Sequence, residues 1–418
     1  MSVAGPLSLG QLSVWHDIRD LPGPRHHEAN NAALWALPHG AGPGEVRTAL
    51  RAVVARHPSL RTRYDLHDPG SPGQLAPDTD FSDALAVVGT GDSPLDDFTA
   101  EPAARRFRLG REHGWRATLL TRANGPSHLL FVKHHIAADA WAQEVLRQEF
   151  TAALADPGGL GPGIASGPAE LAADQFTPAG LRRQAAALGH WDRLLDQAPP
   201  AALPTADGTG AGVVQATLRS GPARAAARRI AKAAQVSVSS VVLAAYARSV
   251  ARICGTDTLL VQLMSANRFA ARWKNVVTSM NQWVPALIEG AREDDLRTLA
   301  RAAHWSSLGA FRHGAHDVMA VAGLLARRPE APEPACAFNF VAMPEQQLPG
   351  SGAPASATEP DITWEEPFTT IGPRCYARAL ESDDGLSVRL TAKDIGRERC
   401  AGLLWDMHDT LVATAGAC

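Results

Sequence analysis

The stretch from Phe131 to Trp141, FVKHHIAADAW, holds two adjacent histidines with an aspartate four residues after the second one. Side chains alternate between the two faces of a strand, so His134 and His135 would point in opposite directions and only one could face a given substrate. A histidine at a strand end can act as a general base near neutral pH when its imidazole is uncharged. The spacing therefore indicates one working histidine, with Asp139 in a supporting role.

Asp139 stands directly before a predicted helix, Ala140 to Ala155, whose apolar residues recur at helical spacing. Aspartate is favoured at this N-cap position, and its carboxylate could also hold the turn by pairing with an arginine. The free N–H groups at the helix start, near Ala140 and Trp141, could stabilise a developing oxyanion. The alternative is that both histidines are packed or solvated and that Asp139 is only an N-cap.

A second histidine pair, His26 and His27, lies in the stretch PRHHEANNA. No strand, turn and aspartate surround this pair in the order seen at His134 and His135. We therefore expect His26 and His27 to occupy a solvated or rim position without a part in chemistry.

A β-hairpin and the helix after it would position the first motif. The stretches Trp115 to Thr121 and His128 to Lys133 read as strands joined by a turn at Ala123 to Pro126. An earlier helix is predicted over Gly44 to Arg56. The Pro- and Gly-rich run from Ala155 to Pro168 reads as a surface loop or linker and marks the best domain boundary.

The second half of the chain also mixes helices and strands. Expected helices and strands alternate here, and a further Pro-, Gly- and Ser-rich loop is expected over Pro344 to Pro360. The helices are expected over Leu181 to Asp196, over Ala223 to Ile253 with a break near Gln235 to Ser237, and over Gly396 to Ala413, and the strands over Leu259 to Met264 and Leu386 to Ala392.

The bulk composition excludes several classes of protein. The chain has 418 residues, enough for about two domains, with 45% hydrophobic and 20% charged residues and a formal net charge of −3. No basic run suggests nucleic acid or an acidic membrane surface, and no apolar run approaches the roughly 20 residues of a membrane span. Five dispersed cysteines without CxxC spacing and the lack of a visible signal peptide favour reduced thiols in the cytoplasm and no metal site.

Several further stretches occur in a recognisable order along the chain. They are LSLGQLSVW (Leu7 to Trp15), RHPSLRTRY (Arg56 to Tyr64), the HHIAADAW motif, LPTAD (Leu203 to Asp207), SANR (Ser265 to Arg268), NVVTSMNQWVPALI (Asn275 to Ile288) and AFNF (Ala337 to Phe340). Together they resemble the condensation domains of nonribosomal peptide synthetases, in the chloramphenicol-acetyltransferase-like superfamily, whose central motif is HHxxxDG. The matches span nearly the whole chain, and each is weak alone.

This resemblance implies a fold and a domain organisation. The fold would be mixed α/β, with two chloramphenicol-acetyltransferase-like lobes in a V-shape and an active-site channel between them. The N-terminal lobe would cover residues 1–170 and carry HHxxxDA, and the C-terminal lobe would cover residues 171–418. No adenylation or carrier-protein motif is visible, so we expect a free-standing domain or one excised from a longer chain.

The resemblance also implies roles for individual residues. His135 matches the histidine that deprotonates or positions the acceptor, and His134 matches a structural histidine. Asp139 matches an aspartate that shapes the site through an arginine, for which Arg268 is the first candidate and Arg61 the fallback.

Two residues of the later motif complete the expected site. Asn281 matches the asparagine of a segment near the crossing between lobes, and Trp283 is a candidate to line the channel. An aromatic residue in such an apolar run is more often part of the core.

Three departures from the family pattern bear on activity. Ala140 replaces the glycine after the aspartate, Ala142 replaces a frequent serine, and the threonine after the asparagine is missing. Alanine is sterically tolerable at the first turn of a helix, where φ is negative, but it adds a methyl group where substrate would pass. These departures argue against standard amide formation between two amino acids and leave two alternatives: acyl transfer with an unusual donor or acceptor, or a site that has lost its activity.

Three functions follow from the resemblance. The first is an acyltransferase that joins an acyl or aminoacyl thioester on the phosphopantetheine arm of an acyl or peptidyl carrier protein to an amine or alcohol, forming an amide or ester in natural-product and antibiotic biosynthesis. It would need no bound cofactor. The second uses acyl-coenzyme A as the donor. The third is a degenerate, non-catalytic domain that recruits partner enzymes.

Overall fold

The chain folds into two compact units in the computed structural model, which describes residues 3–80, 85–156, 158–160, 163–199, 203–205, 212–293, 295–341, 359–367, 369–382 and 385–416. Within these ranges the first unit holds the residues up to Arg183 together with Ala266–Asn281, and the second unit holds the others. These units differ from a single division at residue 170. The first unit continues to Arg183, and it also includes the later segment Ala266–Asn281. Most of the loop predicted at Pro344 to Pro360 lies outside the described residues.

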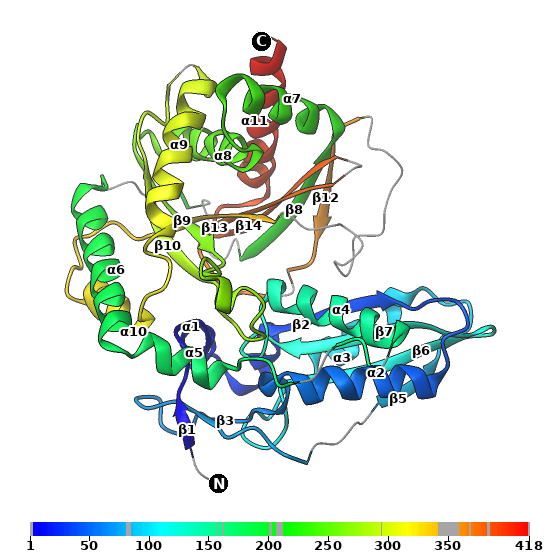
Figure 1. Ribbon diagram of the computed structural model, residues 1–418. Coiled ribbons are helices and arrows are strands. Elements are labelled where there is room, and N and C mark those ends of the chain that lie inside the picture. The colour runs from blue at the N-terminus through cyan, green and yellow to red at the C-terminus, as the bar shows by residue number, and fades with distance from the viewer. Residues whose placement is uncertain are drawn as a thin grey trace. The chain divides into compact units, whose positions relative to one another are not determined.

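The first unit is built around a four-stranded sheet with two long helices on one face (Figure 1). Its strands are β2 (Asn30–Ala36), β7 (Gly125–His134), β6 (Trp115–Arg122) and β5 (Leu85–Gly89), in that spatial order, and the helices are α2 (Pro43–Arg56) and α4 (Ala140–Ala155). Strand β7 is antiparallel to both β2 and β6, and β5 is parallel to β6. The predicted hairpin ends at the histidine motif, which passes directly into α4.

The remaining elements of the first unit are short, apart from three helices. They are β1 (Val3–Pro6), α1 (Leu9–Ile18), β3 (Tyr64–Asp65), β4 (Gly73–Leu75), α3 (Ala100–Ala104), α5 (Pro168–Gln175), the start of α6 (Pro178–Gln197), and the 3-10 helices η1 (Gly23–Ala29), η2 (Pro58–Arg61), η3 (Leu95–Phe98) and η4 (Ala271–Trp273). Strands β1, β4 and β3 form a second, three-stranded sheet.

Aromatic stacking anchors the core beneath the hairpin. Phe131 on β7 stacks on Trp35 of β2 with ring centroids 4.7 Å apart and on Trp115 of β6 at 5.8 Å. The indole N–H of Trp115 donates to the Leu60 carbonyl at 2.7 Å, so this buried polar group is satisfied. The packing fixes the end of β7, and with it the direction of the histidine motif.

The second unit contains a seven-stranded sheet covered on one face by four helices (Figure 1). Its strand order is β10 (Gln282–Ile288), β9 (Leu259–Ser265), β11 (Cys336–Val341), β13 (Cys375–Glu381), β14 (Leu386–Lys393), β8 (Val213–Ser220) and β12 (Asp361–Glu365). The helices are α7 (Gly221–Ala234), α8 (Val238–Cys254), α9 (Leu296–Phe311) and α11 (Arg397–Gly416), and α10 (Val318–Ala326) packs with α6 in a smaller cluster. The mixed α/β fold predicted from the sequence is confirmed.

Helices α7 and α8 are separated where the sequence predicted a break. Gln235 adopts a left-handed conformation with φ of 56° and ends α7, and the Ser237 side chain caps α8 by accepting from the Ser240 N–H. No single helix among the described residues is long and apolar enough to cross a membrane. The pair formed by α7 and α8 meets that test only jointly, across a bend of 107°. Cys254, Cys336, Cys375 and Cys400 are all free thiols.

One segment connects the second unit to the site in the first. The chain leaves β9 at Ser265, contributes Ala266–Asn281 to the first unit, and returns as β10, whose Gln282 pairs with Ser265. Val277 in this segment is 1% exposed and belongs to the core beneath α2 and α4. We call Ala266–Asn281 the bridging segment.

Candidate active site

Asp139 and Arg268 form an almost fully buried ion pair between the histidine motif and the bridging segment. The Arg268 guanidinium donates to both carboxylate oxygens of Asp139, at 2.8 and 3.0 Å. The side chain of Asp139 is 3% exposed and that of Arg268 is 2% exposed. Burial by itself raises the pKa of Asp139, but the Arg268 charge, together with hydrogen bonds to the carboxylate, outweighs burial and lowers that pKa below its usual value. Asp139 is therefore a carboxylate at neutral pH.

Asp139 also organises the backbone on both sides of the pair. It caps α4, because its Oδ1 accepts from the Ala142 N–H at 2.8 Å, and its Oδ2 accepts from the Met280 N–H at 3.0 Å. Arg268 in turn donates to the carbonyls of Val276 and Thr278 at 2.7 and 3.2 Å. The pair thus fixes the start of α4 and the end of the bridging segment against each other.

Arg61, the alternative partner for Asp139, is bonded elsewhere. Its guanidinium donates to the carbonyls of Val54 and Ala55 at the end of α2, and to the Asp78 carbonyl at 2.6 Å. Arg61 therefore secures the end of a helix, and the structure pairs Asp139 with Arg268.

The two histidines of the motif have different surroundings. His134 is 1% exposed; its Nδ1 accepts from the Ile136 N–H at 3.1 Å, and its ring packs edge-on against Phe107. His135 is partly exposed, and its backbone N–H donates to the Ala29 carbonyl at 2.8 Å. Burial lowers the pKa of His134 to about 3. Burial, followed by the positive charge of Lys133, lowers the pKa of His135 to about 4. Both imidazoles are therefore neutral at pH 7.

A short chain of hydrogen bonds orients the His135 ring. The Ser279 hydroxyl lies 3.3 Å from His135 Nδ1 and donates to Asn281 Oδ1 at 3.2 Å. A serine hydroxyl has a single proton to donate, so toward His135 it accepts from Nδ1–H. The opposite ring nitrogen, Nε2, then keeps its lone pair, which is the state that a general base requires.

The predicted oxyanion residues lie at the exposed start of α4. Ala140 is exposed and Trp141 is 42% exposed, while the next N–H group, that of Ala142, already donates to Asp139. The added methyl group of Ala140 thus lies on the surface of its own unit. The oxyanion role stays a prediction.

Trp283, predicted near the channel, belongs to the second unit. It lies on β10, is partly buried, and packs edge-on against Tyr376 with ring centroids 5.2 Å apart. It points away from the helix-covered core that holds its neighbour Val284. Its role in a channel stays a prediction.

The pair His26 and His27 lies in the 3-10 helix η1, and both rings are partly exposed. The His26 ring bonds the Leu21 carbonyl at 3.0 Å and the His27 ring bonds the Pro24 carbonyl at 2.7 Å. Both contacts are local, and the partial exposure agrees with the position expected from the sequence.

Sequence reasoning missed two residues that contact the site. Ser279 lies 144 positions from His135 in the chain, so only tertiary structure brings them together. Lys133, immediately before the histidines, is 0% exposed and donates to the Ala138 carbonyl at 2.7 Å. A lysine within an otherwise apolar strand end was the one available signal, since lysine is rarely buried completely.

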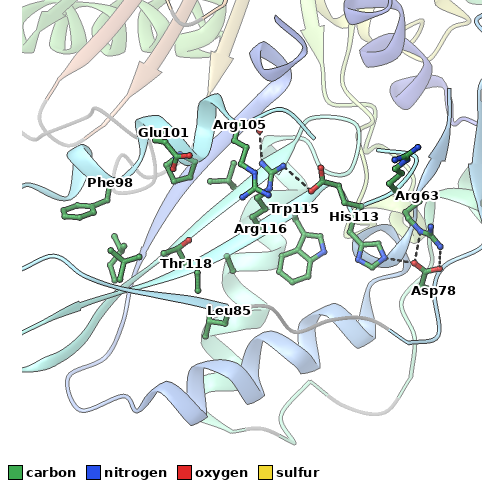
Figure 2. Close-up of a pocket in the computed structure, with 18 of the residues that line it drawn as sticks. Arg63, Asp78, Leu85, Phe98, Glu101, Arg105, His113, Trp115, Arg116 and Thr118 are labelled. Atoms are coloured by element: carbon green, nitrogen blue, oxygen red, sulfur yellow. Dashed lines mark hydrogen bonds and ion pairs between the residues drawn. The ribbon is translucent and has the colours of Figure 1, made fainter. Parts of the chain in front are cut away.

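A separate cavity of about 970 Å³ lies in the first unit near β5 and β6 (Figure 2). Its charged groups include several that pair with each other: Arg63 and His113 both contact Asp78, at 2.8 and 2.9 Å, and Arg116 contacts Glu112 at 3.2 Å. None of the histidine-motif residues 134–139 lines this cavity. Within the described ranges no group of three or more His, Cys, Asp or Glu side chains is arranged to hold a metal ion.

The fold and site define a mixed α/β protein with one partly exposed, neutral histidine beside a buried Asp–Arg pair. Its sequence matches the family model for the condensation domain over residues 23–348. The chain therefore belongs to the condensation domain family, and the resemblance noted in its motifs is confirmed.

Curated relatives are much longer than this chain. It is 26% identical over 305 residues to nonribosomal peptide synthetase kk1B of Curvularia clavata, covering 70% of this chain and 2% of that protein. It is 34% identical over 148 residues to the probable non-canonical nonribosomal peptide synthetase CymA of Salinispora arenicola, covering 35% of this chain and 2% of the relative. The similarity thus concerns one small part of these synthetases.

Solved structures share the fold over nearly the whole chain. A structure described as the molecular basis for condensation domain-mediated chain release from the enacyloxin polyketide synthase has a TM-score of 0.77 at 22% identity, covering 99% of this chain and 82% of that one. SgcC5 from Streptomyces globisporus has a TM-score of 0.73 at 21% identity, covering 98% of each chain. At these identities the likeness establishes the fold.

Replacing Asp139 by Asn tests the ion pair. Asparagine caps a helix about as well as aspartate, so any decrease in the free energy of unfolding reports the lost ion pair with Arg268. We expect Asp139→Asn to lower the free energy of unfolding by about 3–5 kcal/mol, measured by denaturant titration, because it leaves a buried guanidinium without its carboxylate. The matched control is Asp295→Asn at the partly exposed N-cap of α9, which should cost under about 1 kcal/mol. Equal losses in the two variants would contradict the role given to the pair.

Replacing Gly10 by Ala tests the close packing behind Ser279. A Cβ atom at Gly10 in α1 would overlap the Ser279 carbonyl and lie 2.6 Å from Met280 Cα. We expect Gly10→Ala to lower the free energy of unfolding by about 1–3 kcal/mol, as overpacking does. The control Gly309→Ala, on the open surface of α9, should instead stabilise by about 0.5–1 kcal/mol. A stabilised Gly10→Ala variant would show that the helix and the bridging segment do not touch as described.

Proposed function

We propose that this condensation domain is an acyltransferase that uses His135 to join a thioester-bound acyl or aminoacyl group to an amine or hydroxyl. The observation that carries the proposal is the partly exposed His135 ring, neutral at pH 7 and oriented through Ser279 so that Nε2 is free. Asp139 and Arg268 support this ring indirectly, by holding the turn and the bridging segment. We propose for these residues the roles that the family resemblance implies, and the contacts described above support them.

The proposed reaction exchanges one acyl bond for another. The acceptor nitrogen or oxygen attacks the thioester carbonyl, and His135 Nε2 accepts the proton that the nucleophile loses. When the tetrahedral intermediate collapses, the carbon–sulfur bond breaks and the proton passes to the leaving thiolate. A new amide or ester and a free thiol result, and no oxidant, metal or bound cofactor takes part. Proton transfer by a positioned histidine typically contributes about 10²–10⁴-fold to the rate.

A carrier protein is the proposed donor partner, with its phosphopantetheine arm bearing the thioester. The family membership supports this choice, because the matched relatives are named as nonribosomal peptide synthetases. The crystallised SgcC5 complex holds (R)-1-(2-naphthyl)-1,2-ethanediol, so the acceptors to test include alcohols as well as amines. We place the reaction in natural-product biosynthesis in the cytoplasm, with Ala140, Trp141, Asn281 and Trp283 as proposed substrate contacts.

The fold alone does not decide between catalysis and partner recruitment. Structures of the same fold include the epimerization domain of tyrocidine synthetase B and an X-domain in complex with OxyB from teicoplanin biosynthesis, with TM-scores of 0.73. The retained, neutral His135 favours catalysis in this chain.

Replacing His135 by Ala tests the proposal. The purified chain is incubated with an acyl-loaded carrier protein or acyl-coenzyme A and a panel of amines and alcohols, and product is measured by mass spectrometry. We expect turnover with the carrier-bound donor, and we expect His135→Ala to reduce kcat/KM by about 10²–10⁴-fold because general base catalysis is lost. The matched control His27→Ala, in the other histidine pair, should retain activity.

Each other outcome selects a different function. Turnover with acyl-coenzyme A but not with the carrier protein would replace the proposed donor. Full activity of His135→Ala would refute its role as the base. Lack of turnover with every donor, together with tight binding to a biosynthetic enzyme, would identify a recruitment domain.

A further inference from the structure

Lys133 lies beneath the histidine motif and contacts it from inside the protein. It is the last but one residue of β7, and its register partner on β2 is Asn31. Its ammonium group donates to Asn31 Oδ1 at 3.1 Å and to the Ala138 carbonyl at 2.7 Å. The second bond crosses the turn between β7 and α4, so Lys133 fastens that turn to the strands.

Fold stability does not account for a charge at this position. Lys133 is 0% exposed, and among the described side chains it makes no ion pair within 4 Å. The anion nearest in the motif, Asp139, is already bound by Arg268. A buried ammonium with two neutral acceptors costs free energy, and apolar replacements of buried charges are often neutral or stabilising. A lysine here therefore calls for a reason other than stability.

The charge of Lys133 acts on His135. Lys133 lies two positions before His135, and His135 is the first residue of the turn that Lys133 fastens through the Ala138 carbonyl. The ionisable groups around His135 come from three elements: Lys133 and His134 from β7, Asp139 at the start of α4, and Arg268 from the bridging segment, with His26 of η1 affecting His134. The negative charge of Asp139 favours a charged imidazole at His135. Lys133 opposes it.

We propose that Lys133 is a positioning residue of the site, whose buried ammonium holds the turn through Ala138 and keeps His135 an uncharged imidazole. The proposal rests on the proposed function, because an uncharged His135 is useful where it accepts a proton.

The pKa values of Lys133 and His135 support this role. Burial lowers the pKa of Lys133 to about 7, so Lys133 gains its charge as the pH falls below neutrality. That charge then resists protonation of His135, whose pKa is lowered to about 4. His135 thus stays uncharged through the weakly acidic range in which an isolated histidine would be cationic.

Three substitutions separate charge from hydrogen bonding. Lys133→Met removes both, Lys133→Gln removes the charge and keeps a donor for the Ala138 carbonyl, and Lys133→Arg keeps the charge. The His135 titration is followed by NMR of histidine-labelled protein without substrate, with the signal assigned from His135→Ala. Circular dichroism at each pH confirms that the fold persists. The matched control is Lys232→Met on the exposed side of α7.

We expect Lys133→Met and Lys133→Gln to move the His135 titration upward by about one pH unit, since a like charge nearby shifts a pKa by that order. Lys133→Arg and Lys232→Met should leave it in place. The acid limb of the kcat/KM profile should move with the titration in the neutral variants. An unmoved titration in a folded Lys133→Met or Lys133→Gln variant overturns the proposal, as does failure of both neutral variants to fold. The NMR result is independent of turnover, so loss of the proposed function alone leaves this inference standing.

Discussion

The buried pair of Asp139 and Arg268 is the constraint on which the site depends. Two charges inside a protein are tolerated only when each is neutralised and hydrogen-bonded. Here the requirement is met where the turn after β7 and the bridging segment come together. The pair therefore joins parts of the chain that are 129 residues apart and makes one site of them.

Once the pair is formed, the other site contacts follow from chain geometry. Met280 donates to Asp139, which places Ser279 beside the His135 ring, and Gly10 provides the space that this approach needs. Val277 secures the same segment in the core under α2 and α4. The His135 ring is thus contacted by Ser279, whose neighbour Met280 is held by the ion pair. Loss of the pair should affect chemistry and folding together.

Much of the first unit could be predicted from the sequence, because its signals are local. Alternation and the Ala123 to Pro126 turn predicted the hairpin, and helical spacing after Asp139 predicted α4 with the bounds observed, Ala140–Ala155. The pairing of Asp139 with Arg268 was expected only from the family resemblance. Ser279 and Lys133 were not anticipated, because their roles depend on a long-range contact and on the register between β2 and β7. The bridging segment likewise divides the chain in a way that no single linear boundary expresses.

The protonation state of His135 tests the central claim most directly. In ¹⁵N NMR spectra of histidine-labelled protein at pH 7, the two ring nitrogens distinguish the cation from each neutral tautomer. The account predicts a neutral ring with its proton on Nδ1, toward Ser279, and a lone pair on Nε2. A charged imidazolium at pH 7, or a proton on Nε2, would contradict the account, because no lone pair would then be available on the nitrogen that faces away from Ser279.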